Sequence, residues 1–357
     1  MRPGRCMRWV GALALAALAV VSAAPARADD ALTLAFVGDV MFGRYVPGGL
    51  APIAAERHDP FAAVAEVVGA ADLAFANLET PVLATPDPVS RWGTRMRFVA
   101  TPARIASLAA AGFDVVSLAN NHHYDQRARG VAETPAHVAA VGLTAIGAAR
   151  RRAPVRVETL ERAGWRLAVV AVTTVRNGDP RPGPQLPHVE QHRLVKQVAP
   201  LVRRARADHD LVLVVVHWGR EYADAPSAAQ VAIAHRLIDA GADALIGSHP
   251  HEVQAIERYR SGVIAYSLGN FLFDNARPVQ RDGGVLALTF ARRGAASCLA
   301  AARFTPTVIS PGPVFHPELA VDAQGDAGRA RLIALSADRA TPWTDDGGAL
   351  VTSGACP

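Results

Sequence analysis

Two histidines one residue apart, His249 and His251, are the residues of this chain best suited to chemistry. They follow an apolar run at residues 243–246 that is typical of a buried strand. In extended chain, residues at i and i+2 project to the same side, so both rings are expected to face one point. Neutral imidazole is the commonest side-chain metal ligand, so the pair suggests a metal site. The pair alone leaves a second interpretation open, two polar histidines in a loop.

Other predicted strands also end in residues that can bind a metal. The C-terminal ends of parallel strands meet at one edge of a sheet, where the sites of open α/β sheets form. Asp and Asn are common after strands because both favour turns, but His has no such preference. The pattern therefore predicts one metal site built from Asp39, Glu79, Asn121, His217, His249 and His251.

The elements that must position these residues alternate between strand and helix over the first two thirds of the chain. Strands are predicted at 32–37, 73–76, 113–118, 144–147, 155–160, 165–173, 211–216, 243–246, 253–258, 262–268, 284–291 and 299–309. Helices are predicted at 59–70, 101–111, a region ending near 141, 190–206, 226–240 and 326–338. The alternation followed by consecutive strands predicts a layered α/β domain, with a mainly parallel sheet extended by an antiparallel section.

The first 28 residues have the pattern of a secretory signal peptide. Arg2, Arg5 and Arg8 precede an apolar run at residues 10–21, and Ala26-Arg27-Ala28 is a typical cleavage site. The run is too short to span a bilayer comfortably, and no later apolar stretch suggests a membrane span. The sequence therefore predicts a secreted or periplasmic protein, cleaved near Ala28.

Removing the leader changes the charge of the chain. The 37 basic and 32 acidic residues give a net charge of +5, and four of those arginines but no acidic residue lie in residues 1–28. The remainder carries +1, which argues against a nucleic-acid partner. Two cysteines remain, Cys298 and Cys356; they could pair in an oxidising compartment, and two free thiols are the alternative.

Six ordered motifs resemble the CapA family, which is associated with synthesis of the poly-γ-glutamate capsule. They are residues 37–44 (VGDVMFGR), 76–81 (ANLETP), 118–122 (LANNH) with Asp125, 216–219 (VHWG), 247–251 (GSHPH) and 266–271 (YSLGNF) with Asp274. The resemblance covers roughly residues 32–310. The expected organisation is a signal peptide at 1–28, a CapA-like domain at 29–312 and a C-terminal extension with a short helix at 313–357.

This family is similar to the calcineurin-like metallophosphoesterases. The resemblance implies a four-layer αββα sandwich with mixed sheets, in which Glu79 takes the place of a bridging carboxylate. It also implies that His122, beside Asn121, protonates the leaving group. Asp125, three residues further on, could orient the His122 ring.

The chain departs from the phosphoesterase pattern at three positions. Met41 stands where those enzymes have a histidine ligand, and a thioether is a soft ligand that suits Mn²⁺ or Zn²⁺ poorly. Glu79 replaces an aspartate and Asn120 replaces a glycine. We therefore expect one or two divalent ions, with mixed nitrogen and oxygen ligands that suit Mn, Zn or Fe.

Two further residues are candidates for substrate binding. Arg44 follows Asp39 in a Gly-flanked loop, and its fork fits phosphate or carboxylate, although a surface arginine is the simpler interpretation. Asn270 ends another predicted strand and could equally belong to a turn.

Three functions remain open on the sequence. They are a metal-dependent hydrolase acting on or beside an anionic polymer such as poly-γ-glutamate, a non-catalytic scaffold that binds this polymer, and a general extracellular phosphoesterase.

Overall fold

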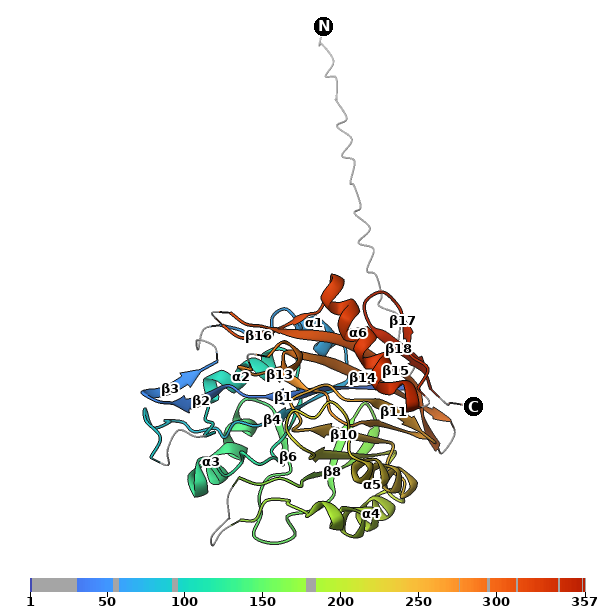
Figure 1. Cartoon of the computed structure of the whole chain (residues 1–357), viewed down its shortest axis with the longest axis horizontal. Coiled ribbons are helices and arrows are strands. Elements are labelled where there is room, and N and C mark those ends of the chain that lie inside the picture. Colours follow the sequence, from blue (N-terminus) through green and yellow to red (C-terminus); the bar gives the residue numbers. More distant parts are fainter. Residues whose placement is uncertain are drawn as a thin grey trace.

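The computed structural model describes residues 1, 31–53, 58–91, 96–177, 184–275, 277–293, 296–312, 314–339, 341–354 and 356. The described strands form two large sheets and one short hairpin, with helices outside the sheets (Figure 1). The predicted leader at 1–28 lies almost wholly outside the described residues. Within those residues, no helix has both the length and the apolar character needed to cross a membrane.

The larger sheet joins a parallel half to an antiparallel half. Its main path runs β17-β18-β15-β14-β1-β4-β5-β6, while β13 pairs with β1 and β16 with β15. The parallel strands are β1 (Ala31–Val40), β4 (Leu73–Leu78), β5 (Val115–Ser117), β6 (Thr144–Ile146) and β13 (Asn270–Leu272). The antiparallel strands are β14 (Asp282–Arg293), β15 (Ala296–Ser310), β16 (His316–Leu319), β17 (Thr344–Asp345) and β18 (Leu350–Ser353).

The smaller sheet has a parallel centre with antiparallel edges. Its order is β11-β12-β10-β9-β8-β7. The parallel strands are β8 (Trp165–Thr173), β9 (Leu211–His217), β10 (Ala244–Ser248) and β12 (Gly262–Ala265). The antiparallel edges are β7 (Glu158–Arg162) and β11 (Ile256–Tyr259).

Side-chain alternation along β1 shows how the layers are stacked. Leu34 and Phe36 lie in a buried cluster shared with strands β8, β9 and β10 of the other sheet, so the two sheets pack face to face. Ala35 and Val37 point the other way, into a cluster with the helices on the outer face. This outer layer contains α1 (Ala65–Gly69), α2 (Pro102–Ala110) and α3 (Arg127–Ala140).

The outer face of the smaller sheet is covered in the same way. A third buried cluster joins β8 and β9 to α4 (Leu194–Ala205) and α5 (Ala228–Asp239), which lie side by side in Figure 1. The helix α6 (Asp322–Ser336) packs against β11 and β15. The predicted four-layer αββα sandwich with mixed sheets is therefore confirmed.

The structure corrects three details of the sequence prediction. The parallel strands belong to two sheets and not to one. The helix predicted at 59–70 begins only at Ala65, because the Asp59 carboxylate accepts a hydrogen bond from the Phe61 N–H (2.9 Å) and holds a turn before it. Strands β2 (Gly43–Val46), β3 (Gly49–Pro52), β13, β16, β17 and β18 were not predicted, so Arg44 and Asn270 lie in strands and not in a loop or turn.

The chain after residue 313 packs onto the two sheets. Strand β18 pairs with β15, and the hydroxyls of Ser336 and Thr341 accept hydrogen bonds from backbone N–H groups of β11. Cys298 in β15 forms a disulfide with Cys356. The sequence had left this pairing open, and the domain boundary near 312 stays a prediction.

Two glycines allow the segment 266–269 to pass between the ends of β1 and β10. A Cβ atom at Gly38 would lie 2.0 Å from the carbonyl oxygen of Gly269, and one at Gly247 would lie 2.0 Å from the carbonyl oxygen of Tyr266. Both distances are far below a van der Waals contact, and both neighbours are backbone atoms that cannot swing aside. These contacts bring the ends of the two sheets together where the predicted site residues lie.

We expect Gly247→Ala to destabilise the fold by about 3 kcal/mol or more, because the added methyl group must push the backbone of Tyr266 away. Gly69→Ala is the matched control, since its Cβ would meet no atom within 4 Å and its φ is not positive. Urea unfolding measures both variants. Equal stability of Gly247→Ala and wild type would contradict this close approach.

Candidate metal centre

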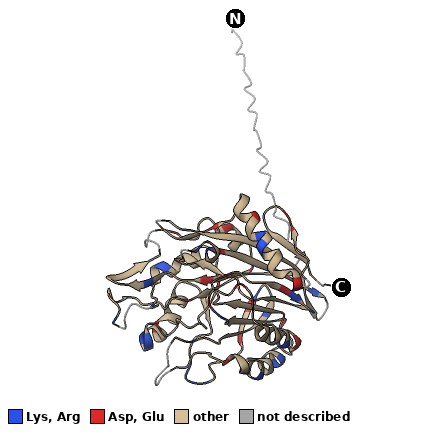
Figure 2. Cartoon of the chain, viewed as in Figure 1, with Lys and Arg blue, Asp and Glu red and all other residues tan. Residues whose placement is uncertain are grey.

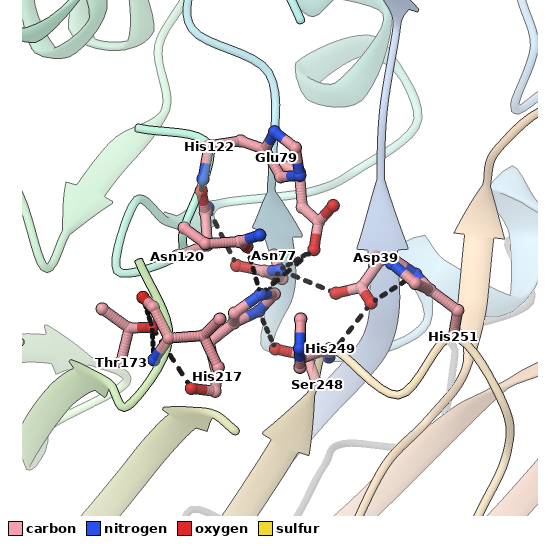
Figure 3. Close-up of polar contacts among 12 residues, drawn as sticks. Asp39, Asn77, Glu79, Asn120, His122, Thr173, His217, Ser248, His249 and His251 are labelled. Atoms are coloured by element: carbon pink, nitrogen blue, oxygen red, sulfur yellow. Dashed lines mark hydrogen bonds and ion pairs between the residues drawn. The ribbon is translucent and has the colours of Figure 1, made fainter. Parts of the chain in front are cut away.

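The carboxylate of Asp39 lies at the centre of the predicted site. Asp39 is the penultimate residue of β1, and its side chain is fully buried. Its Oδ1 accepts a hydrogen bond from Asn77 Nδ2 (2.7 Å), and its Oδ2 accepts one from the His249 backbone N–H (3.1 Å). His251 Nδ1 lies 3.3 Å from the same Oδ2. Asp39 is thus held by donors from both sheets (Figure 3).

A second group of polar atoms converges beside Asp39. His217, the last residue of β9, places its Nε2 2.8 Å from Asn121 Oδ1 and 3.4 Å from Glu79 Oε1. The other ring nitrogen, Nδ1, lies 2.9 Å from Ser248 Oγ and 3.2 Å from Asn77 Nδ2. Nε2 therefore faces two oxygen atoms of the kinds that bind divalent ions.

The two histidines that follow β10 do not have the extended backbone that the sequence suggested. His249 has φ +99° and His251 has φ +58°, so the two rings converge through positive φ on either side of Pro250. Such conformations cost a non-glycine residue about 1–3 kcal/mol each, and they cluster at functional sites. The site holds this strain in place through the bonds of the His249 N–H and the His251 ring to Asp39.

The protonation of the imidazoles differs across the site. Burial, reinforced by the nearby His251, lowers the pKa of His249 to about 3. Burial and the neighbouring histidines lower the pKa of His217 well below its usual value. Burial also opposes the charge on His251, but its hydrogen bond to Asp39 and the charge of that carboxylate outweigh burial and raise its pKa. His217 and His249 are therefore neutral at pH 7, the form that binds metals.

Glu79 is buried, and burial together with the negative charge of Asp39 raises its pKa well above the ordinary range. Burial and the charge of Asp39 thus disfavour the ionised form of Glu79. A cation bound beside the carboxyl group would stabilise that form.

His122 and Asp125 form a pair at the edge of this group. His122 Nδ1 lies 2.8 Å from Asp125 Oδ2, which also accepts a hydrogen bond from the Phe98 N–H (2.8 Å). The Phe98 ring stacks on the imidazole with a centroid distance of 3.8 Å. These contacts fix the ring and leave its Nε2 3.5 Å from Asn177 Nδ2.

The structure places the remaining predicted residues nearby. Asn270 Oδ1 accepts a hydrogen bond from His251 Nδ1 (2.9 Å), which leaves Nε2 of that ring free to bind. Arg44 is ion-paired with Asp274, and its guanidinium lies 5.7 Å from the centre of the Phe98 ring. Substrate binding by Arg44 and Asn270 stays a prediction.

Four residues at the site were not singled out from the sequence. Asn77 and Ser248 contact the ring of His217, and Asn177 contacts both Asn121 and His122. Asn77 and Ser248 end strands next to predicted ligands, which is the signal that could have revealed them. Glu221 lies in an exposed loop, and its sequence carries no such signal.

The donor set fits a divalent cation. One group of possible ligands consists of Asp39, Glu79 and His251, whose ligand atoms lie within 4.8 Å of one another. Two buried atoms, Glu79 Oε2 and His249 Nδ1, have no hydrogen-bond partner among the described residues. Unpartnered buried polar atoms are costly, and a bound cation would satisfy them. Imidazole nitrogen with carboxylate and amide oxygen suits Mn²⁺, Zn²⁺ or Fe²⁺.

The chain is thus a four-layer α/β protein with a cluster of carboxylates and imidazoles at its strand ends. The family model for the bacterial capsule synthesis protein PGA_cap matches residues 33–275. The chain therefore belongs to the PGA_cap family, as the CapA resemblance predicted.

Relatives agree with this assignment. The chain is 32% identical to a capsule biosynthesis protein CapA of Bacillus anthracis, over 73% of this chain and 64% of that protein. It is 30% identical to a PGA biosynthesis protein CapA of Bacillus subtilis, over 74% of this chain and 70% of that protein. The chain thus spans about two thirds of the length of these relatives.

A solved structure is also similar. The calcineurin-like phosphoesterase YfkN of Bacillus subtilis has 12% sequence identity and a TM-score of 0.44, covering 86% of this chain and 96% of that one.

His123, next to the site, gives a prediction for the pH dependence of stability. Burial lowers its pKa to about 4 from 6.5, so between these values the unfolded chain binds a proton that the folded chain does not. This histidine therefore destabilises the fold progressively as the pH falls from 6.5 to 4. Relative to His123→Gln, the wild-type free energy of unfolding should fall by up to about 3 kcal/mol across this window.

Urea unfolding at a series of pH values, with a chelator present, measures the difference. The control is His192→Gln, at an exposed position. A constant difference for His123→Gln would contradict the prediction.

Proposed function

We propose that this chain is an exported, metal-dependent hydrolase that takes part in the synthesis or export of capsular poly-γ-glutamate. The family and the names of its relatives support the capsule process. The cluster of buried carboxylates and neutral imidazoles supports metal-dependent hydrolysis.

The pairing of His122 with Asp125 is the observation that carries the enzymatic assignment. A cation site needs ligands, but it does not need an imidazole that is oriented by a carboxylate and stacked on a phenyl ring. With Nδ1–H bonded to Asp125, the ring presents Nε2 as the atom that gives or takes a proton. The family resemblance implies that the histidine beside Asn121, which is His122, protonates the leaving group.

The other side chains of the site would bind the cation or orient its ligands. Glu79, Asn121, His217 and His249 would hold a cation on one side, and Asp39, Glu79 and His251 on the other. When bound, a divalent cation supplies Lewis-acid activation of water and of the scissile group. Asn77, Ser248 and Asn270 orient the ligands through the hydrogen bonds described above. His122 moves the proton, and Asp125 fixes its ring.

Export is supported by two features at opposite ends of the chain. The leader pattern at residues 1–28 precedes the first described strand, and Cys298 forms a disulfide with Cys356. Disulfides persist in oxidising compartments, which fits a secreted or periplasmic protein.

An anionic polymer is the partner we propose, although the charges do not favour it strongly. Figure 2 shows basic and acidic residues interspersed over the elements. Arg44, beside Asp274 and Phe98, is therefore a better candidate for contact with carboxylates than any broad basic surface.

The position of Met41 favours a second candidate, a non-catalytic scaffold that binds the polymer. Met41 is fully buried in the apolar cluster under α1 and α2, so its sulfur packs in the core, where the resemblance implies a histidine ligand. The loss of this one ligand would weaken metal binding without disturbing the fold.

The deciding experiment incubates the mature protein with Mn²⁺ or Zn²⁺ and assays a phosphodiester, a phosphomonoester and γ-linked glutamate oligomers. We expect turnover of at least one substrate. His122→Asn should lower it by roughly 10²–10⁴-fold while metal content is unchanged, because only proton transfer is lost.

His192→Asn, at an exposed position, is the control and should retain full activity. If none of the three substrates is turned over while the polymer binds saturably, the scaffold function is correct and the hydrolase proposal is wrong.

A further inference from the structure

We infer that Glu221 is an additional metal ligand, which joins His249 and His251 around a divalent cation. The inference rests on the proposed metal-dependent function, but it assigns a residue that the motif pattern does not include. A carboxylate oxygen of Glu221 and ring nitrogens of the two histidines lie within 4.8 Å of one another, the spacing of atoms that share one ion.

The loop that carries Glu221 is fixed against the histidine segment. The backbone N–H of Tyr222 donates to the carbonyl oxygen of Pro250 (2.8 Å), the residue between the two histidines. One residue further on, the carbonyl oxygen of Ala223 accepts a hydrogen bond from Gln254 Nε2 (2.7 Å). The side chain of Glu221 is exposed, but these two hydrogen bonds hold its loop against the segment that carries His249 and His251.

A second observation points to a ligand at this place. His249 is only 4% exposed, and its Nδ1 has no hydrogen-bond partner among the residues that the structure describes. A ring nitrogen kept away from water without a partner is costly, and a cation shared with Glu221 would satisfy it.

Glu221 also supplies a metal ligand of a kind that Met41 does not. The resemblance implies a histidine at position 41, but the thioether there packs in the apolar core. A carboxylate is a hard, charged ligand that suits Mn²⁺ beside imidazole. His251 belongs to both groups, with Asp39 and Glu79 on one side and with Glu221 and His249 on the other. The motif pattern assigns His249 and His251 to different cations, whereas the group with Glu221 brings both rings to one cation.

The test measures binding of Mn²⁺ to the metal-stripped mature protein by calorimetry and by equilibrium dialysis. We expect Glu221→Gln to weaken binding by roughly tenfold or more, and to reduce the rise in melting temperature that Mn²⁺ gives. Because the side chain is exposed, the melting temperature of the variant in chelator should equal that of wild type. Glu161→Gln, at an exposed position of β7, is the matched control and should bind like wild type.

The outcomes separate this inference from the proposed function. If wild type binds no Mn²⁺, and no Zn²⁺ or Fe²⁺ under the same conditions, the metal-dependent function itself is wrong. If wild type binds Mn²⁺ and Glu221→Gln binds it with the same affinity and stoichiometry, Glu221 is not a ligand and only the inference is overturned.

Discussion

The buried carboxylate of Asp39 is the constraint on which the site depends. An ionised carboxylate removed from water is tolerated only where donors or cations surround it. Asn77, from the same sheet, and the loop of His249 and His251, from the other sheet, supply the contacts. Because these partners come from strands far apart in sequence, their contacts with the Asp39 carboxylate also fix how the ends of the two sheets meet.

Backbone features around Asp39 follow from this requirement. Gly38 and Gly247 leave room for the segment 266–269, whose Gly269 carbonyl oxygen accepts a hydrogen bond from the Asp39 N–H (3.0 Å). The positive φ angles of His249 and His251 are a local cost of bringing the His249 N–H and the His251 ring to one carboxylate. Within the described residues, the same geometry leaves Glu79 Oε2 and His249 Nδ1 without a hydrogen-bond partner, which supports the proposed cation.

Much of this site could be predicted, because its ligands follow strands that hydrophobic runs reveal. His217 and His249 come directly after such runs, and a histidine there is not explained by turn preference. The division into two sheets could not be derived from the runs alone, since a parallel strand has the same apolar pattern in either sheet; the family resemblance supplied it. Glu221 was missed because an exposed loop glutamate has no local signal. Only tertiary contacts, such as that of Tyr222 with Pro250, bring it to the histidines.

The most direct measurement is a crystal structure of the mature protein grown with Mn²⁺, with anomalous scattering collected at the manganese edge. The account predicts an anomalous peak among Asp39, Glu79 and His251, with the imidazoles of His217 and His249 facing the same cavity. A clear structure with no peak at these side chains, or with the manganese bound only elsewhere on the surface, would contradict it.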